Sequence, residues 1–178
     1  DFTVNSMALE LTADKPDFID PFNGLQDLAA RVLRTPVRPG DSFNDDPLRM
    51  MRAARFASQL DFEIAPEVLT SMKDLAHRIS IISAERLRDE LIKIVMSANP
   101  RIGITLLVDT GLADIVLPEI PKLRLEVDEH HHHKDVYEHS ITVLEQAIEL
   151  EERLGGPNLV IRLSALLHDI GKPKTRAF

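Results

Sequence analysis

Apolar residues recur at the spacing of an α-helix from about residue 43 onward. Met50, Ala53, Ala54 and Ala57 follow the i, i+3, i+4, i+7 pattern, and Leu60 continues the same stripe. Side chains at this spacing lie on one face of a helix. Aromatic residues make up only 4% of the chain, so aliphatic side chains must build the core, which favours packed helices. The pattern therefore predicts a mainly α protein.

Further helices are expected over residues 65–79, 83–98, 102–110, 112–117, 136–154 and 159–170. The N-terminal part is different, because residues 7–11, 18–19 and 32–33 favour extended structure and residues 24–31 favour a helix. Turn-forming residues are dense in the stretch DPFNG between them. We therefore expect a mainly α fold with a small α/β remnant at its N-terminus.

The chain is acidic, with 29 Asp and Glu residues against 21 Lys and Arg residues and a formal net charge of −8. Phosphate groups are usually bound by a basic surface, so a nucleic-acid partner would need a local basic patch here. Cysteine is absent, which excludes disulfides and thiolate zinc sites. No apolar run approaches the roughly 18 residues of a membrane span. We expect no membrane partner and a cytoplasmic location; the oligomeric state stays open.

Three arginines recur every third residue in the stretch DDPLRMMRAARF at 45–56. Guanidinium groups on one side of a helix repel one another unless an anion lies beside them, such as a triphosphate, an RNA backbone or a row of carboxylates. The residues concerned are Arg49, Arg52 and Arg55. Asp46 lies one turn before Arg49, so an acceptor stands beside a donor fork. Such a pair matches the pairing edges of adenine and cytosine, and leaves groups unpaired against guanine and uracil.

The same stretch also has a purely structural interpretation. Asp46 before Pro47 has the form of an N-cap followed by proline at the first helical position. Alternatively, Ser42 caps the helix and Asp45 completes a box-like arrangement. The arginines would then pair with some of the many acidic residues.

A His-Asp pair stands on a nearly all-apolar helix near the end of the chain. Burial of His168 and Asp169 is costly unless they are paired or bind a ligand. Together with His139 they could hold a divalent metal ion, which would lower the pKa of a bound water and favour phosphoester hydrolysis. The alternative is a hydrogen bond between His168 and Asp169 inside a helical bundle. The four histidines at 130–133 are a weaker metal signal, because consecutive residues cannot all face one ion.

Four stretches resemble, in order, the motifs of class II tRNA nucleotidyltransferases and bacterial poly(A) polymerases. DFTVNSMAL at residues 1–9 is similar to RRDFTxNAMAL, and IDPFNG at 19–24 with residues 28–35 is similar to IDPFGG…DL…LR. Residues 45–56 resemble EDPLRMLRAARF, with Asp45 in place of the usual Glu, and residues 82–91 resemble ISxERxxxEL. The HHKDVYEH stretch and the His-Asp pair resemble the HD superfamily, whose later Asp would lie beyond Phe178.

This resemblance implies a template-independent enzyme that adds C and A to the 3′ end of tRNA. Asp46 and Arg49 would select CTP or ATP, Arg52 and Arg55 would line the same nucleotide site, and Asp1 would lie near the ribose. The catalytic Mg²⁺ ions would be held by carboxylates in a head upstream of Asp1. The chain is therefore expected to be a fragment that cannot transfer nucleotides by itself.

The resemblance also divides the chain. Residues 1–40 would be the remnant of the head, 41–98 the neck that selects the nucleotide, 99–128 the body, and 129–178 the truncated start of an HD domain. Candidate contacts to RNA phosphates are Arg86, Arg88 and Lys93, whose alternative is a solvated helix face. Two other functions stay open, an HD-type metal-dependent phosphohydrolase and a poly(A) polymerase of the same family. A helical module that binds neither nucleotide nor metal is a third.

Overall fold

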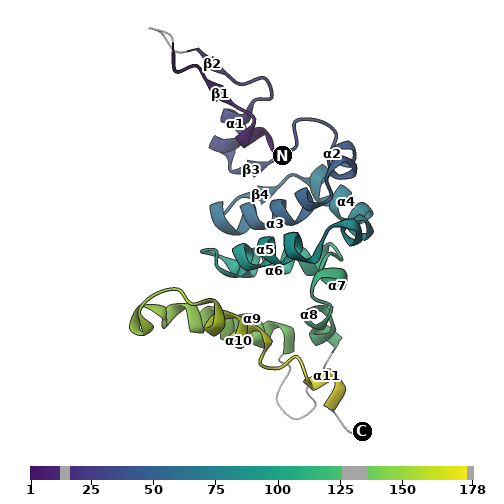
Figure 1. Cartoon of the computed structure of the whole chain (residues 1–178), viewed down its shortest axis with the longest axis vertical. Helices are drawn as coiled ribbons and strands as arrows, with labels where there is room; N and C mark the ends of the chain where they lie inside the picture. Colours follow the sequence, from purple (N-terminus) through teal and green to yellow (C-terminus); the bar gives the residue numbers. More distant parts are fainter. Residues whose placement is uncertain (13–16, 126–135, 176–178) are drawn as a thin grey trace.

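A computed structural model describes residues 1–12, 17–125 and 136–175. Its N-terminal part begins with a 3₁₀ turn, η1 (Thr3–Asn5), followed by the antiparallel strands β1 (Ala8–Leu9) and β2 (Phe18–Ile19). Helix α1 (Gly24–Ala30) and strand β3 (Val32–Leu33) come next. These elements confirm the predicted α/β part, and the hairpin of β1 and β2 extends away from the helices (Figure 1).

A parallel ladder ties this N-terminal part to the helices that follow. Strand β3 pairs with β4 (Glu63–Ile64), with Val32 opposite Glu63 and Leu33 opposite Ile64. The chain between the two strands forms α2 (Pro39–Asp45) and α3 (Leu48–Leu60). The pairing of β3 with β4 therefore holds the start and the end of the segment that contains α2 and α3 next to each other.

Helix α3 carries the apolar stripe that the sequence predicted. Met50, Ala53, Ala54 and Ala57 are fully buried, whereas Leu60 at the end of the stripe is 43% exposed. The helix ends there because Asp61 adopts the left-handed conformation, with φ 56°. The stripe packs against the helices below it, so α3 lies at the centre of the described core.

The helices below α3 form the next layer in Figure 1. Directly below α3 lie α5 (Ala84–Val95) and α6 (Pro100–Asp109). Helix α4 (Pro66–Leu75), continued by the 3₁₀ helix η2 (Ala76–Ile81), lies beside α3 and packs against α2. Helices α7 (Ala113–Val116) and α8 (Glu119–Lys122) and the 3₁₀ turn η3 (Leu123–Leu125) continue downward from this layer. Helix α6 crosses α3 closely at Gly103, where an added Cβ atom would collide with the Ser58 hydroxyl and Ile94. Only glycine leaves room for this crossing.

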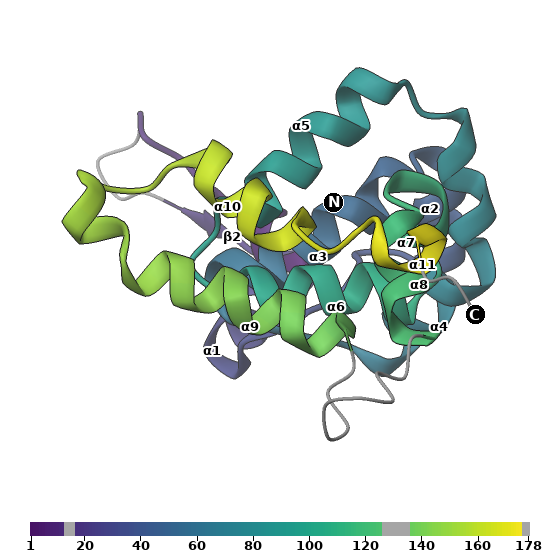
Figure 2. The ribbon, with the colours of Figure 1, turned by 90° about the horizontal axis from the view of Figure 1, so that it is seen from below.

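The C-terminal segment forms the lowest layer of the molecule. Helix α9 (Val136–Glu149) and α10 (Leu159–Leu167) lie side by side, joined through η4 (Glu151–Leu154), and α11 (Lys172–Thr175) follows (Figure 2). Arg101 of α6 bonds to α9, with Nε 2.6 Å from Glu145 Oε1 and Nη1 2.8 Å from Glu138 Oε2. This network fastens α9 to the layer above.

A buried ion pair makes the second connection between these layers. Arg162 Nε and Nη2 each lie 2.7 Å from the Glu151 carboxylate, and Arg162 Nη1 donates to the carbonyls of Val95 and Ser97 at 2.8 Å. Arg162 is 4% exposed and Glu151 5%. The arginine therefore satisfies carbonyl groups at the C-terminal end of α5, which have no partner within their own helix.

Four predicted helices differ from those in the structure by three residues or more, among them the one expected over 83–98, which ends at Val95. The helix expected over 136–154 ends at Glu149 and continues as the separate turn η4, and the one expected over 159–170 ends at Leu167. The helix expected over 65–79 changes to 3₁₀ geometry at Ala76. Helix α2 was not predicted as a separate element. The expected class, a mainly α chain, is confirmed, and no helix in the described residues is long and apolar enough to cross a membrane.

Candidate functional site

Two carboxylates lie against the arginines of α3. The Asp1 carboxylate contacts Arg52 and lies 3.6 Å from Arg49 Nε. Glu90 of α5 is 3% exposed, and its Oε2 atom lies 3.2 Å from Arg55 Nε. The expected pairing of arginines with acidic residues is therefore present, and Asp1 reaches the site from about fifty positions earlier in the chain.

Asp46 lies between α2 and α3, and its two carboxylate oxygens have different partners. Oδ1 accepts a hydrogen bond from the Leu48 backbone N–H at 3.2 Å, while Oδ2 lies 3.3 Å from Arg86 Nη2. The first contact satisfies an N–H of the first turn of α3, although the residue at the N-cap is Pro47 and not the predicted Asp46. The second brings Arg86 of α5 to the same carboxylate, which pattern alone did not indicate.

Arg49 is held by the preceding helix. Its Nη1 atom donates to the Ser42 carbonyl oxygen at 3.1 Å and to the Ser42 hydroxyl oxygen at 3.0 Å. Ser42 lies inside α2 and is 1% exposed. The interpretation in which Ser42 caps the arginine-bearing helix and Asp45 completes a box is therefore wrong, because both residues belong to the separate helix α2.

Positive charge exceeds negative charge at this place. The cationic side chains are Arg49, Arg52, Arg55, Arg86 and Lys93, and the carboxylates that they contact are Asp1, Asp46 and Glu90. Burial lowers the pKa of the Arg55 guanidinium, and the charge of Glu90 opposes that shift. On a chain with a net charge of −8, this is a local site to which an anion such as a triphosphate would be attracted.

The predicted RNA contacts lie in three different environments on α5. Arg86 contacts Asp46, and Lys93 Nζ lies 3.0 Å from the buried Glu90, so both adjoin the arginine cluster. Arg88 pairs with its neighbour Asp89 at 2.9 Å and its side chain is 64% exposed. Their role in RNA binding stays a prediction.

A second cluster lies where α9 meets the end of α10. His168 Nε2 lies 3.2 Å and His139 Nε2 3.9 Å from Asp169 Oδ2, and the two imidazole rings are 5.2 Å apart. A hydrogen bond of 2.8 Å joins His168 Nδ1 to the Ala165 carbonyl oxygen. That bond orients Nε2 toward the cluster, as the outer partners of metal-binding histidines do.

These three residues fit a divalent metal ion. Their ligand atoms lie within 4.8 Å of one another, and they are the one such group of His, Asp or Glu side chains in the described ranges. Two imidazole nitrogens and one carboxylate oxygen suit zinc-like transition metals. Lys172 Nζ lies 2.8 Å from Asp169 Oδ2 and competes for that oxygen. The histidines at 130–133 lie outside the described residues.

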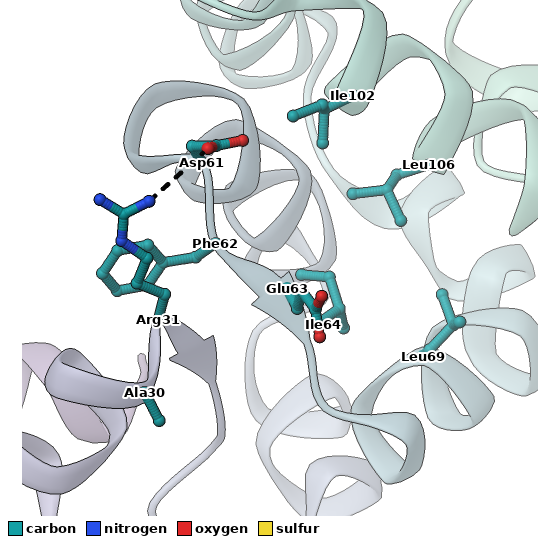
Figure 3. Close-up of a pocket in the computed structure, with 9 residues that line it drawn as sticks. All are labelled: Ala30, Arg31, Asp61, Phe62, Glu63, Ile64, Leu69, Ile102 and Leu106. Carbon is teal, nitrogen blue, oxygen red and sulfur yellow. Dashed lines mark ion pairs between the residues drawn. The ribbon is translucent and has the colours of Figure 1, made fainter.

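A cavity of about 670 Å³ lies apart from both clusters (Figure 3). Arg31 and Asp61 form an ion pair of 3.8 Å beside it, and aliphatic side chains including Ile102 and Leu106 line the opposite side. None of the predicted site residues lines this cavity.

Two family models match the chain. Residues 61–123 match the family described as the probable RNA and SrmB-binding site of polymerase A, and residues 136–178 match the HD domain. The chain is 37% identical over 182 residues to the A-adding tRNA nucleotidyltransferase of Deinococcus radiodurans, covering 99% of this chain and 40% of that protein. It is 38% identical over 182 residues to the multifunctional CCA protein of Hahella chejuensis, with 98% and 40% covered.

Solved structures agree with these relatives. The CCA-adding enzyme of Bacillus stearothermophilus in complex with CTP has a TM-score of 0.65 and 29% identity, over 93% of this chain and 40% of that one. A CCA-adding enzyme in complex with ATP has a TM-score of 0.73 and 26% identity, over 97% and 40%.

The fold and the sequence together place this chain in the class of the class II tRNA nucleotidyltransferases. The chain belongs to the family of the CCA-adding enzymes and spans about 40% of the length of the curated relatives that it matches. Proteins of this family are enzymes, and both they and the HD domain are metal-dependent.

Proposed function

We propose that the protein carrying this chain adds C and A to the 3′ end of tRNA without a nucleic-acid template, using CTP and ATP. The observation that carries the proposal is the arrangement of Asp46 and Arg49, each held by a neighbouring helix beside an excess of positive charge. Relatives named for A addition or CCA addition support it. We further propose a cytoplasmic location.

Base selection follows from the hydrogen-bonding groups of the two side chains. A carboxylate only accepts hydrogen bonds and a guanidinium only donates them. Adenine and cytosine present an amino donor beside a ring-nitrogen acceptor, so Asp46 and Arg49 can satisfy both groups. Guanine and uracil present a carbonyl acceptor beside an N–H donor, and the mismatch would leave polar groups unpaired in the site.

The remaining cations suit the phosphates of the nucleotide. Arg52 and Arg55 lie one and two turns beyond Arg49 on the same helix, and Asp1 contacts the first two of the three arginines. When bound, the Mg²⁺ ions that the family resemblance implies would stabilise charge on the phosphates and activate the RNA 3′-hydroxyl group. We assign them to carboxylates outside this chain, because Asp1, Asp46 and Glu90 each contact an arginine.

The second cluster, which we call the HD cluster, consists of His139, His168 and Asp169 and is suited to bind a metal ion. We do not assign the whole protein a separate function on this basis. His139, His168 and Asp169 would hold a divalent ion, which would supply an activated water for phosphoester hydrolysis. The names of the relatives do not favour a protein that is primarily a phosphohydrolase.

The decisive experiment uses the full-length protein with tRNA that lacks its 3′ end, each nucleoside triphosphate in turn, and Arg49→Ala in parallel. We expect incorporation of C and A only, and loss of incorporation or of selectivity in the variant. Incorporation that does not depend on Arg49 would leave α3 as a scaffold. Metal-dependent phosphatase activity lost in His168→Ala, without nucleotide transfer, would instead support the phosphohydrolase.

A further inference from the structure

Two of the three guanidinium nitrogens of Arg49 have partners. Nη1 donates to both the carbonyl oxygen and the hydroxyl oxygen of Ser42, at 3.1 and 3.0 Å. Nε lies 3.6 Å from Asp1 Oδ1. Within the described part of the chain, Nη2 has no hydrogen-bonding partner. The two N–H groups of Nη2 are therefore the ones left to bind a ligand.

Ser42 offers Arg49 a rigid pair of acceptors. The residue is 1% exposed inside α2, and the next residue, Phe43, is fully buried. Because a guanidinium is an obligatory donor, the serine hydroxyl oxygen must act as acceptor in this contact. A backbone carbonyl alone would hold Nη1 at one point and allow the planar group to turn about it. The hydroxyl adds a second point, which restricts the direction of Nη2.

We propose that Ser42 is a positioning residue that sets the nucleotide selectivity of the site by orienting Arg49. The inference rests on the proposed base selection by Asp46 and Arg49 and adds a residue from a different helix to it. Asp46 is held by α5 and by the start of α3, whereas Arg49 is held by α2. The selecting pair is thus assembled from three helices, and Ser42 is the hydroxyl contact that connects α2 to it.

The test compares Ser42→Ala, Ser42→Cys and Ser42→Thr in the full-length protein. Alanine removes the hydroxyl, cysteine keeps the size but is a weak acceptor, and threonine keeps the hydroxyl. Steady-state incorporation of each of the four nucleotides onto truncated tRNA gives kcat and KM. Thr70→Ala is the matched control, because it also removes one hydroxyl hydrogen bond from a helix: the exposed Thr70 hydroxyl donates to the Pro66 carbonyl oxygen at 2.9 Å in α4.

We expect Ser42→Ala and Ser42→Cys to raise KM for CTP and ATP about three- to tenfold, the net worth of one ordinary hydrogen bond, because the Ser42 carbonyl oxygen still accepts from Arg49. We expect kcat to stay within about twofold and the ratio of kcat/KM for CTP over UTP to fall by a similar factor. Ser42→Thr should retain the wild-type ratio. A purely structural serine would instead lower thermal stability without changing this ratio.

Either of two results overturns the inference while leaving the proposed function standing. One is a wild-type enzyme selective for C and A whose alanine and cysteine variants match Thr70→Ala in all four kcat/KM values. The other is a threonine variant that loses selectivity as much as alanine does. A wild-type protein that adds neither C nor A contradicts the proposed function itself and overturns the inference with it.

Discussion

A lysine stands beside Asp169 at the place where the HD cluster would bind a metal ion. Lys172 Nζ lies 2.8 Å from Asp169 Oδ2, and the lysine side chain is 42% exposed. The Asp169 side chain is only 12% exposed, so the pair is open to solvent at its lysine end alone, and we take about 1 kcal/mol, the upper end of the range for exposed pairs. We therefore expect Lys172→Gln to increase the affinity for Co²⁺ by about two- to fivefold, as measured by calorimetric titration of the full-length protein.

Two further variants complete this experiment. His168→Ala should abolish the Co²⁺ signal, because it removes one of the three ligands. Lys73→Gln, at an exposed position of α4, should leave the affinity unchanged. Undiminished binding by His168→Ala would contradict a metal site at these residues.

At the level of residues, sequence reasoning identified side chains better than their partners. Asp46 and Arg49 could be proposed because they lie within one short motif, and His139, His168 and Asp169 because they match the HD pattern; their roles stay predictions. The contacts of Asp46 with Arg86 and of Arg55 with Glu90 join residues far apart in the chain. Such pairs depend on how α3 packs against α5, which helical periodicity does not specify.

Among the helices and strands, those with a local sequence pattern were predicted, and those without such a pattern or with a distant pairing partner were missed. Helix α3 was predicted from its apolar stripe, and four of the five stripe residues are fully buried. Helix α2 was missed because its start, Pro39-Gly40-Asp41-Ser42, is made of residues typical of turns. Strand β4 was missed because two residues carry no periodicity, and its pairing partner is β3, about thirty positions earlier.

The buried pair of Glu151 and Arg162 makes a prediction about the stability of the C-terminal helices. The hydrogen bonds from Arg162 hold the pKa of the Glu151 carboxyl below its ordinary value. Glu151→Gln leaves a buried guanidinium without its counter-charge, so we expect a loss of about 3–5 kcal/mol in the free energy of unfolding at neutral pH. Urea denaturation measures this loss.

The pH dependence of that loss has a definite sign. A carboxyl whose pKa is lowered by folding contributes stability above its unfolded pKa of about 4.3, and the contribution disappears as the pH falls through the lowered folded value. The difference between wild type and Glu151→Gln should therefore shrink on acidification. Asp61→Asn, in a pair whose side chains are 67% and 62% exposed, should cost no more than about 1 kcal/mol. A difference that stays constant down to low pH would count against the ion pair as the cause.

At the scale of the whole molecule, the charges explain why this chain should not act alone. In the described ranges, each carboxylate of the nucleotide site contacts an arginine, and the one group suited to a metal is the HD cluster. We expect residues 1–178 by themselves to incorporate no CMP or AMP into truncated tRNA, whereas the full-length protein does. Transfer by the isolated chain, measured with radiolabelled CTP, would contradict the assignment of the catalytic carboxylates to a part of the protein outside residues 1–178.

Helix α5 serves two parts of the molecule at once. Its residues Arg86 and Glu90 contribute to the nucleotide site, and the carbonyl groups of Val95 and Ser97 at its C-terminal end accept hydrogen bonds from Arg162. In evolutionary terms, the C-terminal helices therefore cannot be exchanged for unrelated ones without affecting α5. Recombination that replaced them with a segment lacking an arginine at the matching place would leave the end of α5 without its donor, so descendants should inherit the two together.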